Sequence, residues 1–354
     1  MQTLRLIVLL VLWSSFHGPA VATGAAGVAD ASPVRVAAEK AAGSLEQVWS
    51  LPGSWSGIVT EQESGNVLVA TRSALVEIDS TGRTVRETPF RRSPRLRSAK
   101  FASGQVLLSF STWSPQVTVY DQKGALLWAY PPATGSSGID DVAAVDVDGD
   151  GNDEVVVGFN GSTGVHVLSS KGSVIWTSTT IGNVWHVDGG DLRGNGQPQV
   201  VTTSAAGQVH IFSADGSDRV NIAPGFYAGM VRVGRISAKD NAASIFAAGR
   251  LARSTTLNVA AFAGDGTKKW ESSIDASGTA FAQAATLATT RPWLAVSLQS
   301  GEVFVLDATN GTVIGSADGQ DRAEVAWLTE KSGGAPLLVV SSTTALRAFR
   351  IKDL

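Results

Sequence analysis

Carboxylates at alternate positions make residues 146–154 the part of this sequence best equipped for chemistry. Asp146, Asp148 and Asp150 alternate with apolar or small residues, and Glu154 follows at the start of an apolar run. Hard cations take six to eight oxygen ligands, and aspartates at alternate positions of a tight loop supply several of them at once. The spacing is not that of an EF-hand, whose closing glutamate comes at position twelve and opens a helix. The pattern predicts a metal loop between two strands.

Calcium is the expected metal. Several carboxylates in one tight loop repel each other unless a cation lies between them, and a flexible, carboxylate-rich cage suits the larger coordination shell of calcium better than that of magnesium. The remaining interpretation is an acidic turn without metal. We expect one structural calcium ion.

The elements that must position this loop recur along the chain. A turn between two apolar strands, with a polar residue at its start and a glycine at its end, appears six times, with glycines at Gly82, Gly124, Gly172, Gly216, Gly266 and Gly311. A tryptophan follows the glycine by four positions in three of these units, at Trp128, Trp176 and Trp270. The spacing of 42 to 50 residues between these glycines is typical of propeller blades.

Each unit is consistent with four short strands. In the third unit we expect strands at 139–145, 154–159, 164–168 and 173–177, so that residues 146–153 join the first two. A four-stranded blade cannot bury both of its faces alone, and stacking the blades into a closed ring removes the open edges. The sequence therefore predicts an all-β fold, a β-propeller of four-stranded antiparallel blades.

The number of blades follows from the two ends of the domain. After the fourth strand of the sixth unit, which follows Gly311, the chain provides only three further strands, at 323–328, 337–341 and 345–351, while residues 45–49 form an isolated strand ahead of the first unit. We expect this N-terminal strand to complete the last blade and close the ring. The prediction is seven blades within a single domain, 45–354.

Two families resemble parts of this pattern. Residues 146–158 are similar to FG-GAP or VCBS repeats, the calcium-loop blades of integrin α-subunits, and the blade turns resemble quinoprotein-like (PQQ-like) repeats. Position by position, the first resemblance implies that Asp146, Asp148 and Asp150 bind calcium through their side chains, Asn152 through its backbone carbonyl, and Glu154 as the closing ligand. The family more often has aspartate at that last position. Residues 191–199 of blade four keep the glycines, but Arg193 and Gln199 replace acids, which predicts a turn without metal.

The N-terminus and composition indicate export. Residues 1–22 combine one cation, Arg5, an apolar run too short to span a bilayer, and a small-x-small pattern at 20–22, which together are typical of a cleaved signal peptide. Residues 23–44 have no apolar period and are expected to be a flexible spacer. The chain has no cysteine and a formal charge of −3, which favours neither disulfides nor nucleic-acid binding. We expect a secreted or periplasmic monomer without a transmembrane segment.

Candidate binding residues gather in the loops expected on the face opposite the calcium turn. They are Trp55, Trp113, Tyr130, Trp185, His186, Phe226, Tyr227 and Arg322, together with the inter-blade arginines Arg91, Arg92, Arg95 and Arg97. Exposed aromatic and polar residues suit a protein or carbohydrate partner, and arginines suit its carboxylates or phosphates. The alternative is that the aromatic residues pack between blades and the arginines are merely solvated.

The leading hypothesis is an exported, calcium-stabilised binding or scaffolding module. No set of residues in the sequence forms a convincing catalytic group, although His186 lies where an acid or base would be useful. Alternatives are a propeller enzyme of the quinoprotein-like or lyase type with its site over the channel, and a structural subunit of a cell-envelope assembly. Quinoprotein dehydrogenases normally have eight blades and a vicinal cysteine pair, which this chain lacks.

Overall fold

The computed structural model describes residues 35–38, 45–91, 93–131, 137–217, 219–252, 254–278, 280–318, 322–329 and 333–352. These residues form β-strands and turns, and none of them belongs to a helix long and apolar enough to cross a membrane. The expected signal peptide, 1–22, and most of the expected spacer, 23–44, lie outside the described residues. The strands belong to one compact unit, Pro33–Leu354.

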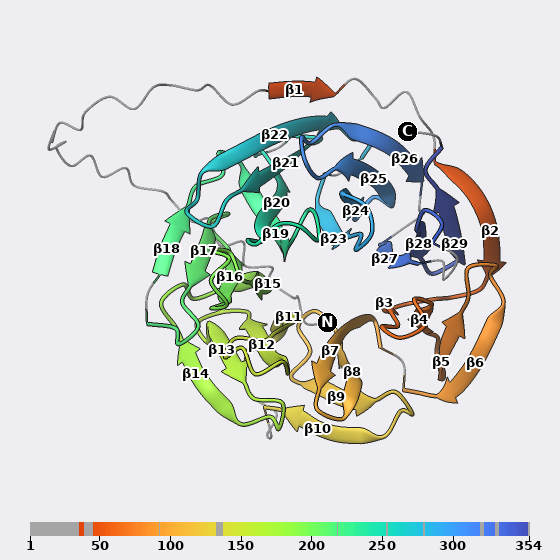
Figure 1. Ribbon diagram of the computed structural model, residues 1–354, viewed down its shortest axis with the longest axis horizontal. Coiled ribbons are helices and arrows are strands. Elements are labelled where there is room, and N and C mark those ends of the chain that lie inside the picture. The colour runs from red at the N-terminus through yellow and green to blue at the C-terminus, as the bar shows by residue number, and fades with distance from the viewer. Residues whose placement is uncertain are drawn as a thin grey trace, which may run out of the picture. The chain divides into compact units, whose positions relative to one another are not determined.

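Seven sheets stand around a central channel like the blades of a propeller (Figure 1), so the predicted architecture is confirmed. In blades one to six the strands run outward from the channel in chain order. Blades one to three contain β3 (Ile58–Thr60), β4 (Val67–Ala70), β5 (Ala74–Ile78) and β6 (Thr84–Pro89); β7 (Arg95–Phe101), β8 (Gly104–Phe110), β9 (Val117–Asp121) and β10 (Leu126–Tyr130); β11 (Ile139–Val145), β12 (Glu154–Phe159), β13 (Val165–Leu168) and β14 (Val174–Ser178). Blades four to six contain β15 (Val184–Gly190), β16 (Gln199–Ser204), β17 (Val209–Phe212) and β18 (Arg219–Ile222); β19 (Tyr227–Gly234), β20 (Ser244–Arg250), β21 (Thr256–Phe262) and β22 (Lys268–Asp275); β23 (Ala282–Leu287), β24 (Trp293–Leu298), β25 (Glu302–Asp307) and β26 (Val313–Asp318).

The ring closes through the N-terminal strand, as predicted. Blade seven consists of β27 (Glu324–Leu328), β28 (Leu337–Ser341), β29 (Ala345–Arg350) and, as its outermost strand, β2 (Glu46–Pro52). The antiparallel register pairs Glu46 with Arg350 and Pro52 with Ala345, so hydrogen bonds join the two ends of the domain. Within the segment expected to be a spacer, residues Arg35–Ala38 form β1, which pairs in parallel with β22 at the outer edge of blade five.

Apolar side chains between the blades hold the ring together. Seven clusters of buried apolar residues occur among the described residues, and each contains residues of two neighbouring blades. The cluster between blades three and four, for example, joins Val156 and Val167 to Val187 and Phe212. Inner strands of a blade, such as β12 and β16, are buried on both faces because a neighbouring blade covers each face, which is why their sequences are apolar runs rather than alternating patterns. Outermost strands such as β6 and β14 are largely exposed.

The repeated tryptophan and glycine contact each other across the blade interfaces. Trp176 Nε1 on the outermost strand of blade three donates to the Ala214 carbonyl in the outer turn of blade four, 2.8 Å away, and its ring covers Gly216. Gly216 has φ +72°, and a Cβ there would lie 2.8 Å from the ring, so only glycine fits. The same contact joins Trp128 to Gly172, Trp270 to Gly311 and, across the ring closure, Trp49 to Gly82.

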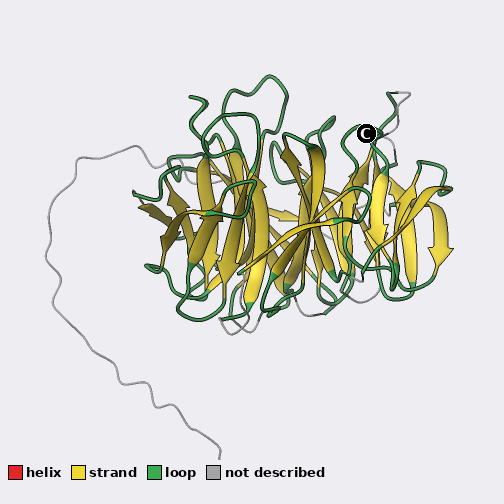
Figure 2. Cartoon of the chain, turned by 90° about the horizontal axis from the view of Figure 1, so that it is seen from below, coloured by secondary structure: helices red, strands yellow, loops and turns green. Residues whose placement is uncertain are grey.

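The two ends of the ring carry different loops (Figure 2). One end, the hairpin face, bears the turns that join the first strand to the second and the third to the fourth in each blade. The other end, the mouth face, bears the loops that join the second strand to the third and the connections between blades. The loop 146–153 joins β11 to β12 and therefore lies on the hairpin face.

Candidate functional site

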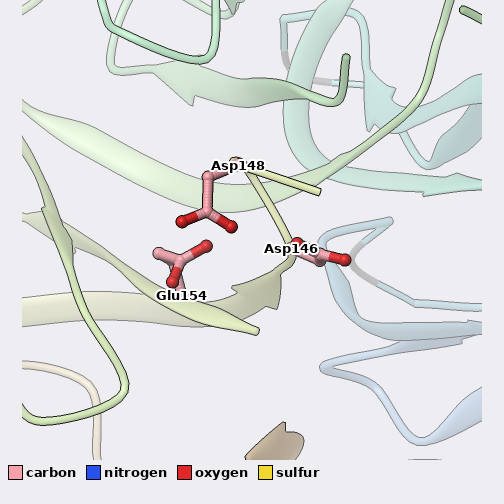
Figure 3. Close-up of side chains that lie close together, drawn as sticks. All are labelled: Asp146, Asp148 and Glu154. Atoms are coloured by element: carbon pink, nitrogen blue, oxygen red, sulfur yellow. The ribbon is translucent and has the colours of Figure 1, made fainter. Parts of the chain in front are cut away.

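The acidic loop on the hairpin face brings three of its carboxylates together. Asp146, Asp148 and Glu154 each have a carboxylate oxygen within 4.8 Å of the other two (Figure 3). The backbone holds these groups: the Gly149 and Gly151 amides donate to Asp146, and the Val147 amide donates to Glu154 at 3.0 Å. Burial, and then the neighbouring aspartates, raise the pKa of Glu154 to about 7. The cluster therefore has a surplus of negative charge and oxygen ligands still available to a cation.

The two other expected ligands, Asp150 and Asn152, lie outside this group of three carboxylates. The Asp150 carboxylate accepts hydrogen bonds from the backbone and side-chain amides of Asn152, at 2.7 and 3.0 Å. Asp153 fastens the loop to blade two, because its carboxylate accepts from the Lys100 amide at 2.6 Å and its own amide donates to the Lys100 carbonyl.

Blade four provides an internal comparison for this loop. The Leu192 amide donates to Gln199 at 3.0 Å, as Val147 does to Glu154, and the Gly196 amide donates to Asp191 at 2.8 Å, as Gly151 does to Asp146. The blade-four loop thus adopts the same hydrogen bonds with Arg193 and Gln199 in place of two acids. The additional carboxylates of blade three are therefore not needed to shape the turn.

A cavity of about 420 Å³ opens on the mouth face over the channel. Blades two to six contribute to its walls, which include the aromatic rings of Trp113, Trp185 and Phe281. Trp185 packs edge-on against Tyr227 with ring centroids 5.2 Å apart, and the Arg250 guanidinium lies 4.2 Å from the centroid of Phe281. Asp140, Asn160 and Asn183 are among the polar residues that line the cavity. Aromatic walls with a few polar groups are typical of ligand sites.

A layer of buried charged residues lies beneath this cavity. This charge layer consists of Arg95, Arg97, Asp141, His186 and Glu324, all on innermost strands. Arg95 Nε donates to Glu324 at 3.1 Å, Arg97 lies 3.3 Å from Asp141, and His186 Nδ1 is 2.9 Å from Asp141 Oδ2. Arg95 and His186 line the cavity, whereas Arg97 lines a second cavity of about 230 Å³ towards the hairpin face. The charge layer therefore separates two cavities and ties together blades two, three, four and seven.

The charges of this layer are matched to one another. Burial would raise the pKa of Asp141, but His186 and Arg97 outweigh it and hold that pKa well below its usual range. Burial lowers the pKa of His186 despite the contact with Asp141. In its neutral form the ring donates from Nδ1 to Asp141 and leaves Nε2 as an acceptor.

Asp140, beside this layer, has no ion-pair partner of its own among the described residues. It is 7% exposed, its Oδ2 accepts from Asn160 Nδ2 at 3.2 Å, and its Oδ1 is buried without a hydrogen-bond partner. Burial raises its pKa to about 6. The Asn183 Oδ1 is also buried and unpartnered. Buried acceptors without partners cost free energy, so two of them around one cavity indicate groups that a ligand completes.

Trp113 is held at the cavity in a strained conformation. Its side chain is 71% exposed and its φ is +68°, a left-handed value that non-glycine residues rarely adopt. Its amide donates to the Ile139 carbonyl at 2.6 Å, and Gly138 approaches so closely that a Cβ would lie 2.7 Å from the Trp113 Cα. An exposed aromatic ring in a strained loop, at the edge of a cavity, is characteristic of a binding residue.

Some of the binding residues proposed from the sequence lie at the cavity, and others lie elsewhere. Trp113, Trp185, His186 and Arg95 line the cavity, and Tyr227 supports Trp185. Trp55 packs against the apolar cluster between blades seven and one, Phe226 is buried between blades four and five, and the Tyr130 hydroxyl bonds His166 at 2.8 Å. Arg322 is exposed with φ +37° and does not line the cavity.

The expected arginine loop does not form one exposed group. Arg91 is exposed and Arg92 lies outside the described residues. Arg95 and Arg97 stand on β7, and their guanidinium groups bind the protein's own carboxylates in the charge layer. Their role is therefore internal, which the sequence interpretation did not foresee.

Asp140, Asp141, Asn183, Phe281 and Glu324 were missed from the sequence. One pattern could have revealed three of them: carboxylates at the start of an otherwise apolar innermost strand, as Asp140 and Asp141 are in β11 and Glu324 is in β27. Charged side chains in an apolar strand need buried partners, which an innermost strand finds across the channel.

The fold and the cavity define a seven-bladed β-propeller with a candidate ligand site over the channel. A scan against protein-family models finds no match to this chain, and a search of curated proteins finds no significant relative.

Proposed function

We propose that this protein is an exported, calcium-stabilised binding module that takes up part of a protein or glycan partner in the cavity on the mouth face. The observation that carries the proposal is the cavity itself. It combines exposed and half-buried tryptophan rings with two buried oxygens, of Asp140 and Asn183, that have no partner in the protein.

The rest of the molecule is arranged as a scaffold for such a site. The charge layer forms the floor of the cavity through Arg95 and His186, and the cavity opens on the mouth face. Five blades contribute lining residues, and the apolar clusters and tryptophan contacts between blades fix their relative positions. A rigid site of this kind loses little conformational entropy on binding, which favours affinity.

Replacing Trp113 with alanine tests the site directly. We expect binding of glycans or peptides, measured on arrays and then by calorimetry with any ligand found, to weaken at least tenfold, because an exposed ring that contributes a central contact is worth more than about 1.4 kcal/mol. Thermal stability should change little, since the ring is 71% exposed. Trp55→Ala, outside the cavity, serves as the matched control. Equal binding by Trp113→Ala and the unmodified protein would contradict the proposal.

The calcium part of the proposal rests on the oxygens of the blade-three loop. Asp146, Asp148 and Glu154 would hold the ion, which would neutralise their mutual repulsion and pin the turn between β11 and β12. The blade-four loop supports this assignment, since it keeps the turn without the acids. The same loop supports a kinship of blade three with FG-GAP repeats, and the tryptophan–glycine contacts support one with quinoprotein-like blades.

Calcium should raise the thermal unfolding midpoint of the mature protein relative to the same protein in chelator. A ligand at a hundredfold excess over its Kd stabilises by about 2.7 kcal/mol when it binds only the folded state. Asp148→Asn should abolish the response, whereas Asp215→Asn, in the exposed outer turn of blade four, should retain it. An unchanged midpoint in the unmodified protein would refute the calcium assignment.

One contact favours a second candidate, an enzyme of the lyase type. The buried Asp141 orients His186, whose second ring nitrogen is available as a general base at the cavity. The test is ultraviolet absorbance of unsaturated product from polyuronates. His186→Asn, which can still donate to Asp141, should abolish any activity without unfolding the protein, and absence of activity in the unmodified protein would remove this candidate.

A further inference from the structure

We propose that the cavity on the mouth face accepts a protonated amine, an ammonium group carried by the partner, at the unpartnered oxygens of Asp140 and Asn183. This inference rests on the proposed binding function and names the chemistry of its ligand. It follows from the charges, the hydrogen bonds and the aromatic rings that surround the cavity.

The charge balance around the cavity leaves one carboxylate without a counter-ion. Arg95 is engaged by Glu324, Arg97 by Asp141 and Glu324, and His186 by Asp141. Asp140 makes no ion pair among the described residues, and its one side-chain hydrogen bond comes from an uncharged amide, Asn160. A buried carboxylate without an opposite charge is costly, and a bound cation would remove that cost.

The hydrogen-bonding groups point to a donor. The two buried atoms without partners at the cavity, Asp140 Oδ1 and Asn183 Oδ1, are both acceptors. An ammonium group has three donors and no acceptor, and so matches groups that can only accept. A neutral hydroxyl would leave the charge of Asp140 uncompensated. An anion would meet the carboxylate of Asp140, whose negative charge repels it.

The aromatic walls are also suited to a cation. Trp113, Trp185 and Phe281 present rings to the cavity, and cations are attracted to the faces of such rings. The Arg250 guanidinium already lies over Phe281, 4.2 Å from its centroid. Arg250 also repels a second cation nearby, so Arg250→Gln should strengthen binding of an ammonium ligand.

The pH dependence has a definite sign. The charged and polar groups that act on Asp140 are Asp141 on the same strand, Arg95 on β7 and the Asn160 amide, and burial dominates them. Because the Asp140 pKa is about 6, the carboxylate is mostly protonated at pH 5 and mostly ionised at pH 7. A cation binds the ionised form, so affinity should rise roughly tenfold from pH 5 to pH 7.

The experiment is a titration of the mature protein in calcium, followed through the indole N–H resonances of Trp113 and Trp185. The ligands are Nα-acetyl-lysine methylamide, its uncharged norleucine analogue, and glucosamine beside N-acetylglucosamine. We expect the amines to bind and the neutral analogues to bind at least tenfold more weakly. Binding of the lysine derivative but not of glucosamine would identify a protein partner. Binding of glucosamine but not of the lysine derivative would identify a glycan partner, and either result supports the ammonium inference.

Variants separate the site from the remainder of the face. Asp140→Asn should abolish the preference for amines and its pH dependence, and Asn183→Ala should weaken amine binding severalfold without changing the charge. Asp275→Asn removes an exposed carboxylate at the end of β22, away from the cavity, and should have no effect. If Asp140→Asn fails to fold, the pH dependence of binding to the unmodified protein and the comparison with Asn183→Ala still test the ammonium inference.

Two outcomes would overturn the inference. Equal binding of lysine and norleucine analogues would show a cavity that does not select charge, and the proposed binding function would survive. No response to any amine would refute the ammonium inference, and the array experiment with Trp113→Ala would then decide the binding function separately.

Discussion

Replacing Glu324 with glutamine should lower the free energy of unfolding by about 3 kcal/mol or more. The side chain is 7% exposed, its Oε1 accepts from Arg95 Nε and Gln283 Nε2 at 3.1 Å each, and its Oε2 lies 3.7 Å from Arg97. Glutamine keeps the shape but removes the charge, so two buried guanidinium groups are left with Asp141 as their remaining carboxylate in the charge layer. Denaturant unfolding at neutral pH measures the loss.

The controls for Glu324 separate burial from charge. Arg83→Gln breaks the exposed pair with Asp79, where the arginine side chain is 79% exposed, and should cost less than about 1 kcal/mol. The double variant Arg95→Gln/Glu324→Gln should be less destabilised than the sum of its single variants, because each removes the other's unpaired charge. Additive losses, or a Glu324→Gln loss as small as that of Arg83→Gln, would show that the charge layer does not hold the blades together.

Replacing Trp270 with alanine should destabilise the propeller by about 3–5 kcal/mol. The ring is 4% exposed, packs between blades five and six, lies against Gly311 and donates from Nε1 to the Ala308 carbonyl at 3.0 Å. Its removal leaves a cavity in the interface and an unpaired carbonyl. The midpoint of chemical denaturation should fall accordingly.

Two variants show which part of the Trp270 contact matters. Trp270→Phe keeps most of the apolar volume and loses the hydrogen bond, so its cost should be well below that of alanine. Trp113→Ala removes an equally large but exposed ring and should cost little stability. If Trp270→Ala were no worse than Trp113→Ala, the tryptophan–glycine contact would not be the interface bond that we infer.

The fold was largely predictable because it is local and repeated. The strands expected at 139–145 and 154–159 are β11 and β12 without change, and the isolated strand expected at 45–49 overlaps β2 (Glu46–Pro52), which closes the ring. Apolar runs bounded by turn glycines specify strands and hairpins within a few residues of one another, and stacking removes their edges. The regularly spaced tryptophan was also visible in the sequence, but its contact with the turn glycine of the next blade was not.

The candidate site was predictable only in part. The sequence pointed to the acidic loop because its residues are contiguous, and the structure brings together Asp146, Asp148 and Glu154. It also pointed to Trp113, Trp185 and His186 as residues of the mouth face, without showing that they share one cavity. Arg95 was interpreted as part of an exposed loop, whereas it is buried against Glu324, 229 positions away in the sequence.

The sequence by itself therefore determined the blades and the acidic turn, since each depends on residues close together in the chain. The number of blades and the closing strand followed from counting strands, because the last blade has only three of its own and an isolated strand precedes the first blade. Only the tertiary structure decided which side chains meet over the channel. Innermost strands of different blades bring Asp140, His186 and Arg95 to one cavity, and their pairing depends on burial and on distances across the ring. Burial and distances across the ring exist only once the ring has closed, so the sequence of a single blade does not specify them.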